Sequence, residues 1–112
     1  MEIRTDAFYV ASKNSWETVS EGVKRQITGY DVSMMMVKVD FETGGIGPIH
    51  QHYHSQTSYV VSGKFEVSIN GEKKILQTGD AFYIAPNILH GAVCLEAGML
   101  IDVFSPIRED FI

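Results

Sequence analysis

The sequence predicts an all-β fold, an antiparallel barrel or sandwich, and three observations support this prediction. Apolar and polar residues alternate in short stretches, as in residues 64–69, where Phe65, Val67 and Ile69 alternate with polar or charged residues. Turn-forming residues separate these stretches, roughly every 8–12 residues. No stretch of a dozen residues has the periodicity of an amphipathic helix. Many short strands with regular turns are typical of antiparallel barrels and sandwiches.

The first half of the chain contains two clear strands before a glycine-rich bend. Residues 23–28 alternate weakly and residues 33–41 strongly, with a turn at residues 29–31 between them. In the second strand we expect the odd-numbered residues, including Met35 and Val37, to face the core. Residues 42–48 form the bend. Neither a Lys-Ser/Thr pair nor a helix follows it, so it is not a phosphate-binding loop.

The second half predicts a series of hairpins. Asn70-Gly71 is the strongest short hairpin signal and favours a type I′ turn. We also expect turns at Ser62-Gly63, at residues 78–80, at Pro86-Asn87 and at Ala97-Gly98. The strands between them cover residues 57–61, 65–69, 72–76, 81–85, 90–95 and 99–104, and residues 105–112 form an extended tail.

Length and composition restrict the class of protein. With 112 residues, the chain is long enough for one domain over residues 1–112, but not for two. The apolar fraction of 45% and charged fraction of 21% are typical of a soluble globular protein. The net charge of −5 argues against nucleic-acid binding, which needs a basic surface, but leaves a small anionic substrate open. The longest apolar run is too short to cross a bilayer, so we expect no membrane partner.

The N-terminal residues and the cysteine content favour a cytoplasmic location. The first residues lack the basic segment and following apolar segment of a secretory signal. The single cysteine, Cys94, cannot form an internal disulfide, which fits a reducing compartment. Cys94 lies among apolar residues and is interpreted as a small core residue.

Histidine and glutamine occupy alternate positions at His50, His52, His54 and Gln56. We expect one β-strand to run through these residues and to continue into residues 57–61. On such a strand the four side chains share one face, with Cα atoms of successive members about 6–7 Å apart. That spacing suits ligands that converge on one metal ion. The remaining histidine of the chain, His90, is expected to be a partner ligand.

Two motifs resemble those of the cupin family. The first, about residues 45–63, contains Gly45, His50-Gln51-His52, Gln56 and Gly63; the second, about residues 79–94, contains Gly79-Asp80, Pro86 and His90. The resemblance implies a cupin-type jelly-roll barrel of antiparallel strands. It also implies one divalent transition metal ion held by His50, His52, Gln56 and His90. Such mixed nitrogen and oxygen ligands do not distinguish Ni, Zn, Mn, Fe and Co. Two interpretations of His54 remain open. It is either a fifth metal ligand or a substrate contact, or it supports the ligands from behind or lies at the rim of the site.

A narrower resemblance concerns the C-terminal half. The chain resembles the pectin degradation protein family at residues 86–98 and 102–111. The order His-x-His-x-His-x-Gln at residues 50–56 also resembles that family. That family acts on 4,5-unsaturated monouronates released from pectin or alginate, and converts them to linear keto acids. The resemblance therefore implies a metal-dependent enzyme that opens and tautomerises a small anionic sugar. It also implies a homodimer.

Three further residues are candidates for the chemistry. Asp102 lies in phase between Leu100 and Phe104, where a buried carboxyl group needs a partner or a function, and it is our candidate for proton transfer. The alternative is that Asp102 faces the surface or pairs with Arg108. Arg108 offers a fork for a substrate carboxylate, or forms a salt bridge within the tail. Phe104 either lines the pocket or only packs. The alternatives are a cupin dioxygenase or isomerase acting on another small acid, and a non-catalytic sugar- or metal-binding cupin.

Overall fold

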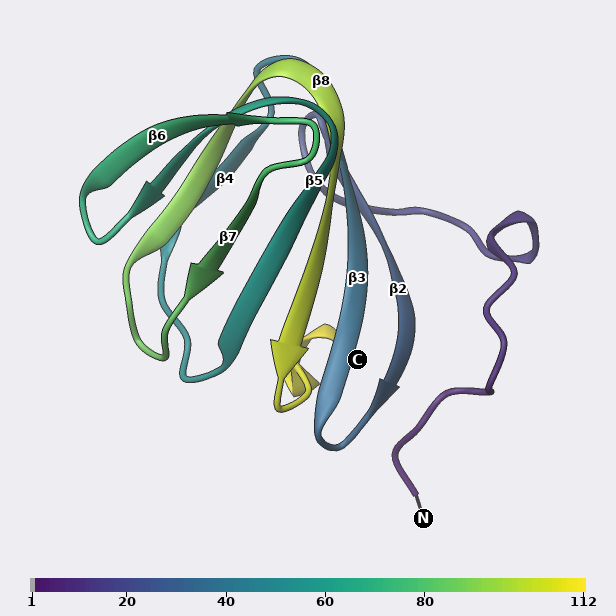
Figure 1. The fold of residues 1–112 in the computed structure, drawn as a ribbon. Helices are drawn as coiled ribbons and strands as arrows, with labels where there is room; N and C mark the ends of the chain where they lie inside the picture. Colours follow the sequence, from purple (N-terminus) through teal and green to yellow (C-terminus); the bar gives the residue numbers. More distant parts are fainter. Residues whose placement is uncertain (1) are drawn as a thin grey trace.

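The computed structural model describes residues 2–112 as eight antiparallel strands and two single-turn 3₁₀ helices (Figure 1). The all-β prediction is confirmed. The elements are η1 (Ala11–Lys13), β1 (Glu17–Ser20), β2 (Val23–Asp31), β3 (Met34–Phe41), β4 (Ile46–His50), β5 (Ser55–Ile69), β6 (Glu72–Gln77), β7 (Ala81–Ile84), β8 (His90–Ser105) and η2 (Glu109–Phe111). Among these residues, no helix has the length and hydropathy that a membrane crossing requires.

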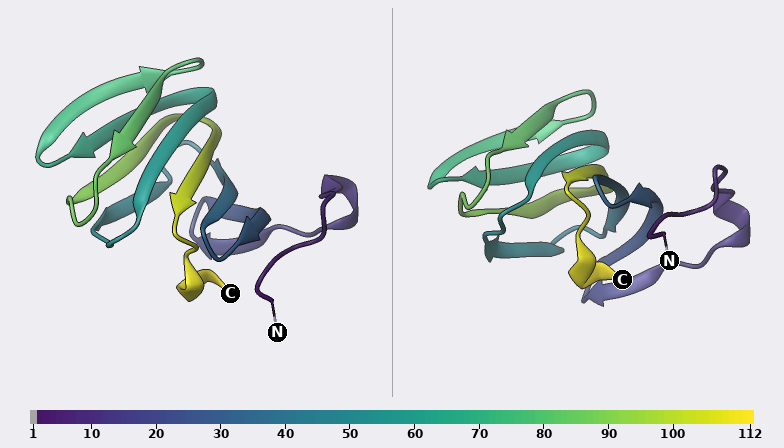
Figure 2. Two further views of the ribbon diagram at one scale, coloured as in Figure 1. Left: turned by 60° about the horizontal axis from the view of Figure 1, so that its bottom comes forward. Right: turned by 90° about the horizontal axis from the view of Figure 1, so that it is seen from below.

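Two long strands, β5 and β8, hold the barrel together. They pair with each other along nearly their whole length, and the hydrogen-bonded order is β1-β2-β3-β8-β5-β6. The first half of β8 also pairs with β4 and its second half with β3, while β5 pairs first with β7 and then with β6. Figure 1 shows both strands curving over the top of the molecule, so each contributes to both walls of the barrel. In Figure 2 the segment before β1 extends away from the strands.

The predicted turns at Ser62-Gly63 and Ala97-Gly98 are wrong, because both strands continue through these points. The β5–β8 register shifts there, with Ser62 opposite Met99 and the next pair at Lys64 and Glu96. Gly63 has a φ of +84°, and a Cβ on Gly98 would lie 2.1 Å from the Ser62 carbonyl oxygen. The glycines therefore permit a paired bulge that bends both strands without ending them.

The prediction of one strand through His50 and Gln56 is also wrong. β4 ends at His50, residues 51–54 form a bend, and β5 begins at Ser55. The reason is topological. β4 pairs with the first half of β8, whereas Ser55 pairs with Ser105 at its far end. The chain must therefore cross from one wall of the barrel to the other between residues 50 and 55, which one straight strand cannot do.

The core confirms the predicted face of β3. Met35 and Val37 are fully buried and Phe41 nearly so, while Met34 and Met36 are exposed. Two clusters form the core, one around Phe41 and Phe65 and the other around Met35, Val37, Phe104 and Ile107. The second cluster lies between β3, the end of β8 and the C-terminal tail, and so fixes the tail against the barrel.

Candidate functional site

Three histidines converge although they come from three different segments. His50 ends β4, His90 begins β8, and the two are cross-strand partners. His52 lies in the bend after β4. One ring nitrogen from each histidine lies within 4.8 Å of the others, and the His50 and His90 ring centroids are 4.3 Å apart. This is close enough for small side-chain rotations to bring all three rings to one metal ion.

Backbone carbonyl groups orient the three rings. In each ring Nδ1 contacts a carbonyl oxygen, at 2.8 Å for His50, 3.1 Å for His52 and 2.8 Å for His90. A carbonyl oxygen only accepts, so the proton of each neutral ring lies on Nδ1 and the Nε2 lone pair is free. Burial lowers the pKa of His90 to about 4 and also lowers the pKa of His52, so both rings are neutral at neutral pH.

The free donor atoms fit a cation. The Nε2 atom of His90 is buried and, within residues 2–112, has no hydrogen-bond partner. The Nε2 atom of His52 lies 3.0 Å from Oε1 of Gln56, whose own amide nitrogen donates to Ser58. Two lone pairs therefore face each other, an arrangement that is unfavourable unless a cation lies between them. The cluster of His50, His52 and His90 can thus hold a divalent metal ion.

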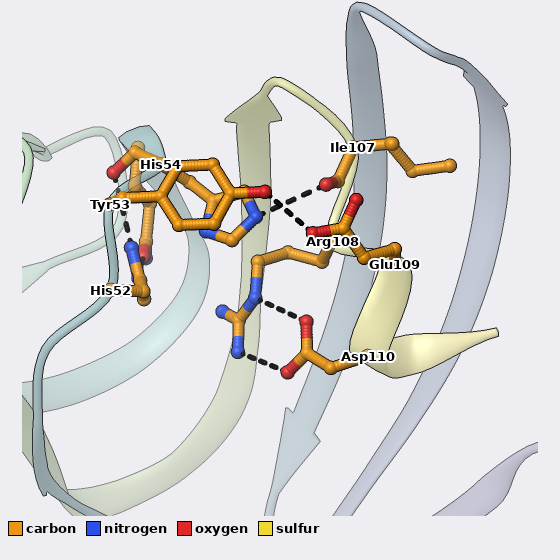
Figure 3. Close-up of polar contacts among 8 residues, drawn as sticks. His52, Tyr53, His54, Ile107, Arg108, Glu109 and Asp110 are labelled. Atoms are coloured by element: carbon orange, nitrogen blue, oxygen red, sulfur yellow. Dashed lines mark hydrogen bonds and ion pairs between the residues drawn. The ribbon is translucent and has the colours of Figure 1, made fainter.

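His54 lies apart from this cluster and faces the C-terminal tail (Figure 3). It is buried, and its Nε2 atom is 3.1 Å from the carbonyl oxygen of Ile107. Its ring stacks on Tyr53 with the centroids 4.0 Å apart, and the Tyr53 hydroxyl group donates to Glu109. His54 therefore connects the bend after β4 to the tail. Of the interpretations offered above, this geometry favours a position behind the ligands.

A cavity of about 320 Å³ opens inside the barrel next to the histidines. Most of its lining is apolar and includes Val37, Ile84 and Leu100. The polar or aromatic side chains that line it near the cluster are His50, Gln56, His90, Asp102, Phe104 and Arg108. Apolar walls with a few converging polar groups are typical of a small-molecule site.

Asp102 reaches this cavity from the last strand. Its cross-strand partner Ser58 donates a hydrogen bond of 2.6 Å to its carboxylate. Burial raises the pKa of Asp102 to about 6, although the hydrogen bond from Ser58 and the positive charge of Arg108 lower it in part. Asp102 is thus a carboxyl group inside the barrel that is held in one orientation.

Arg108 forms the salt bridge within the tail and lines the cavity as well. Its Nε and Nη2 atoms donate to the two oxygens of Asp110 at 3.0 and 2.9 Å (Figure 3). Its guanidinium group also lies 5.0 Å from the centre of the Phe104 ring. Phe104 itself is buried and lines the cavity, so it both packs and forms a wall.

Sequence reasoning missed three residues at this site. Ser58 supports both Gln56 and Asp102, and its even position shares a face with Gln56, a signal that was available. Arg25 and Phe111 also line the cavity. Nothing in the local pattern of β2 or the tail indicates this, because only the packing of the tail over the barrel brings them together.

Comparison with known proteins agrees with this geometry. Residues 37–104 match the family model described as Cupin domain, which is more than half of the chain. The chain belongs to the cupin family. This cupin is 47% identical over 107 residues to the pectin degradation protein KdgF of Dickeya dadantii, covering 94% of this chain and 97% of that protein.

Two solved structures are similar over nearly the whole chain. An RmlC-like cupin from Shewanella frigidimarina superposes with a TM-score of 0.95 at 44% identity, covering 97% of this cupin and 98% of that chain. KdgF from a Halomonas species superposes with a TM-score of 0.92 at 42% identity, covering 96% of this cupin and 100% of that chain.

Proposed function

We propose that this cupin converts 4,5-unsaturated monouronates from pectin or alginate breakdown to linear keto-deoxyuronates. The observation that carries the proposal is that Asp102 and Arg108 line the same cavity as His50 and His90. An enzyme that opens an anionic sugar acid needs a group for proton transfer, a cation for the carboxylate and a Lewis acid. The carboxyl group, the guanidinium group and the metal-binding cluster can supply these three functions. The similarity to proteins named for pectin degradation supports this choice of substrate.

The reaction is an isomerisation and needs mainly proton transfer. Ring opening takes a proton from the anomeric hydroxyl group and breaks the bond between C1 and the ring oxygen. The resulting enol becomes a ketone when C4 gains a proton, so no atom is lost overall. Asp102 moves this proton, and its hydrogen bond from Ser58 holds the carboxylate in place. Arg108 binds the substrate carboxylate, and Phe104 supports the sugar ring.

In this proposal His50, His52, His90 and Gln56 hold one divalent metal ion. Bound there, the metal supplies a Lewis acid and an anchor for sugar oxygens. All four ligands are neutral, so the ion would keep its full charge of +2, which a monoanionic substrate offsets in part. The ligand set is compatible with Ni, Zn, Mn, Fe and Co. We assign His54 to holding the bend that carries His52, rather than to substrate contact.

The direct test uses unsaturated galacturonate that a polysaccharide lyase releases. Metal-loaded protein should accelerate the loss of the ultraviolet absorbance of the conjugated acid, and chelated protein should not. No acceleration over buffer by the loaded protein would exclude the proposal. Oxygen uptake during the reaction would instead indicate a dioxygenase, and tight binding without turnover would indicate a non-catalytic module.

We also propose that the chain forms one domain over residues 1–112, and that it acts as a cytoplasmic homodimer. Exposed apolar side chains on strands that pair on one side only support the dimer, among them Ile46 and Ile49 on β4 and Tyr83 on β7. Light scattering during size-exclusion chromatography tests this, and a mass of one chain at micromolar concentration would exclude the dimer.

A further inference from the structure

Two arginines enclose the ring of Phe111 at one edge of the cavity. The guanidinium carbon of Arg25 lies 4.0 Å from the ring centroid, and that of Arg108 lies 4.2 Å from it. At such distances a guanidinium group covers a ring face, and two cannot share one face without overlapping. The two cations therefore lie on opposite faces of Phe111. Both arginines and Phe111 line the same cavity.

Each guanidinium group is held from its solvent side. Arg25 donates through Nε to Glu17, and Arg108 donates through Nε and Nη2 to Asp110. The acids are mostly exposed, whereas the Arg25 and Arg108 side chains are only 18% and 10% exposed. Within residues 2–112, both terminal nitrogens of Arg25 and Nη1 of Arg108 have no hydrogen-bond acceptor. Both arginines thus retain donors without an acceptor, and both side chains line the cavity.

Arg25 lies farther from the histidines than Arg108 does. The His52 ring contacts Phe104, and Phe104 contacts Phe111, each with a centroid distance of 5.7 Å. Arg108 packs against both phenylalanines, whereas Arg25 contacts Phe111. Because the Phe111 ring separates the two guanidinium groups, a single carboxylate cannot bridge them.

We propose that Arg25 forms a second, outer carboxylate-binding position of the cavity, in addition to the one at Arg108. A sugar acid with an acidic group at each end would have one group for each position. This inference rests on the proposed function only in taking the cavity as the substrate site. The proposed monouronate substrate uses its single carboxylate at Arg108, and a ligand with a second acidic group gains the contact with Arg25 as well. A free guanidinium donor next to an aromatic wall suits a planar carboxylate.

The test measures binding directly and needs no turnover. Metal-loaded protein is titrated calorimetrically with galactarate, which has two carboxylates, galacturonate, which has one, and galactose, which has none. We expect the wild-type protein to bind galactarate about tenfold more tightly than galacturonate, and galactose least tightly. R25Q should lose the preference for galactarate, and R25K should retain part of it.

The neighbouring Lys24 provides a matched control. It is exposed, pairs with Asp40 and does not line the cavity, so K24Q removes the same charge on the outer side of β2. K24Q should keep the full galactarate preference. If R25Q and R25K bind galactarate as the wild-type protein does, or if the wild-type protein does not prefer galactarate, the inference is wrong. Arg25-dependent galactarate binding without turnover of unsaturated galacturonate would instead exclude the proposed function and support this inference.

Discussion

Ser58 on β5 and Asp102 on β8 are cross-strand partners joined by a hydrogen bond of 2.6 Å. The Ser58 oxygen also accepts a hydrogen bond of 3.0 Å from the amide nitrogen of Gln56. One strand pairing thus orients the Gln56 carbonyl oxygen toward the histidines and fixes the Asp102 carboxylate in the cavity. The position of the carboxyl group relative to the histidine cluster follows from strand register rather than from a flexible loop.

Substitution D102N should remove proton transfer while keeping the shape of the site. We expect the turnover rate on unsaturated galacturonate to fall by about 10²–10⁴-fold, the usual contribution of a general acid or base. Metal content and substrate binding should change little, because Asn keeps the size of the side chain and can accept from Ser58. Steady-state kinetics and metal analysis measure both quantities.

Asp40 is the matched control for this substitution. It lies on β3, outside the cavity lining, and pairs with Lys24 at 3.9 Å near the surface. D40N should turn over as the wild-type protein does. Equal rates for D102N and the wild-type protein would exclude Asp102 as the proton-transfer group.

Loss of His90 should remove the metal. H90Q replaces one of the three Nε2 atoms that would bind the metal. Loss of a residue that only supports a ligand typically lowers metal affinity by about 10–100-fold, and we expect H90Q to lower it at least as much. H54Q should lose less metal affinity than H90Q, since the ring of His54 lies outside the cluster and acts only by holding the bend that carries His52. Metal analysis after dialysis against a weak chelator measures the difference. Metal loss in H54Q with retention in H90Q would reverse our assignment of these two residues.

Much of the fold could be predicted because alternation and turn chemistry act locally. The odd-numbered residues of β3 face the core as expected. Asn70 and Gly71 have positive φ values of 52° and 83°, as a type I′ turn requires, and they join β5 to β6 directly. These features depend on a few neighbouring residues, so the sequence is sufficient to identify them.

The errors arose where distant segments decide the outcome. Taken separately in the sequence, Gly63 and Gly98 look like turn residues. In the structure they lie close together on paired strands, where they permit a bulge. The His50–Gln56 segment alternates like a strand, but its two ends pair with opposite ends of β8. The grouping of Arg25, Arg108 and Phe111 depends on where the tail packs, which no local pattern records.

The bulge makes Gly98 intolerant of a side chain. In G98A the added Cβ would lie 2.1 Å from the Ser62 carbonyl oxygen and 2.6 Å from the Gly63 Cα atom. Both are backbone atoms that cannot move without breaking the β5–β8 pairing. We expect unfolding to become easier by about 1–3 kcal/mol or more, as in overpacked cores. Chemical denaturation measures this free energy.

Gly29 is the matched control for this prediction. It also lies within a strand, but the nearest atom to an added Cβ is the Thr5 hydroxyl oxygen at 3.8 Å, an ordinary contact. G29A should change the free energy of unfolding by no more than about 0.5 kcal/mol. Similar stability of the two variants would show that the paired bulge of β5 and β8 can relax around Gly98.

The ion pair between Arg108 and Asp110 should make stability depend on pH in the acidic range. The hydrogen bonds from Arg108 lower the pKa of Asp110 below its ordinary value of 3.8. A group whose pKa is lowered by folding stabilises the folded state at pH values above its ordinary pKa. This stabilisation is lost as the pH falls through the lowered pKa. The melting temperature of D110N should therefore decline less between pH 6 and pH 3 than that of the wild-type protein. Parallel declines would show that the pair contributes nothing.

Cys94 should react slowly while the protein is folded. Its side chain is buried in the core cluster around Phe41 and Phe65, and burial raises the pKa of the thiol above its ordinary value of 9.0. Since the thiolate is the reactive form, both limited access and the raised pKa oppose alkylation. At pH 8 we expect iodoacetamide to label the folded protein much more slowly than free cysteine, and the protein in denaturant at a rate close to that of free cysteine. Mass spectrometry over a time course measures both rates. Rapid labelling of the folded protein would show that the barrel opens between β5 and β8 more often than its packed core indicates.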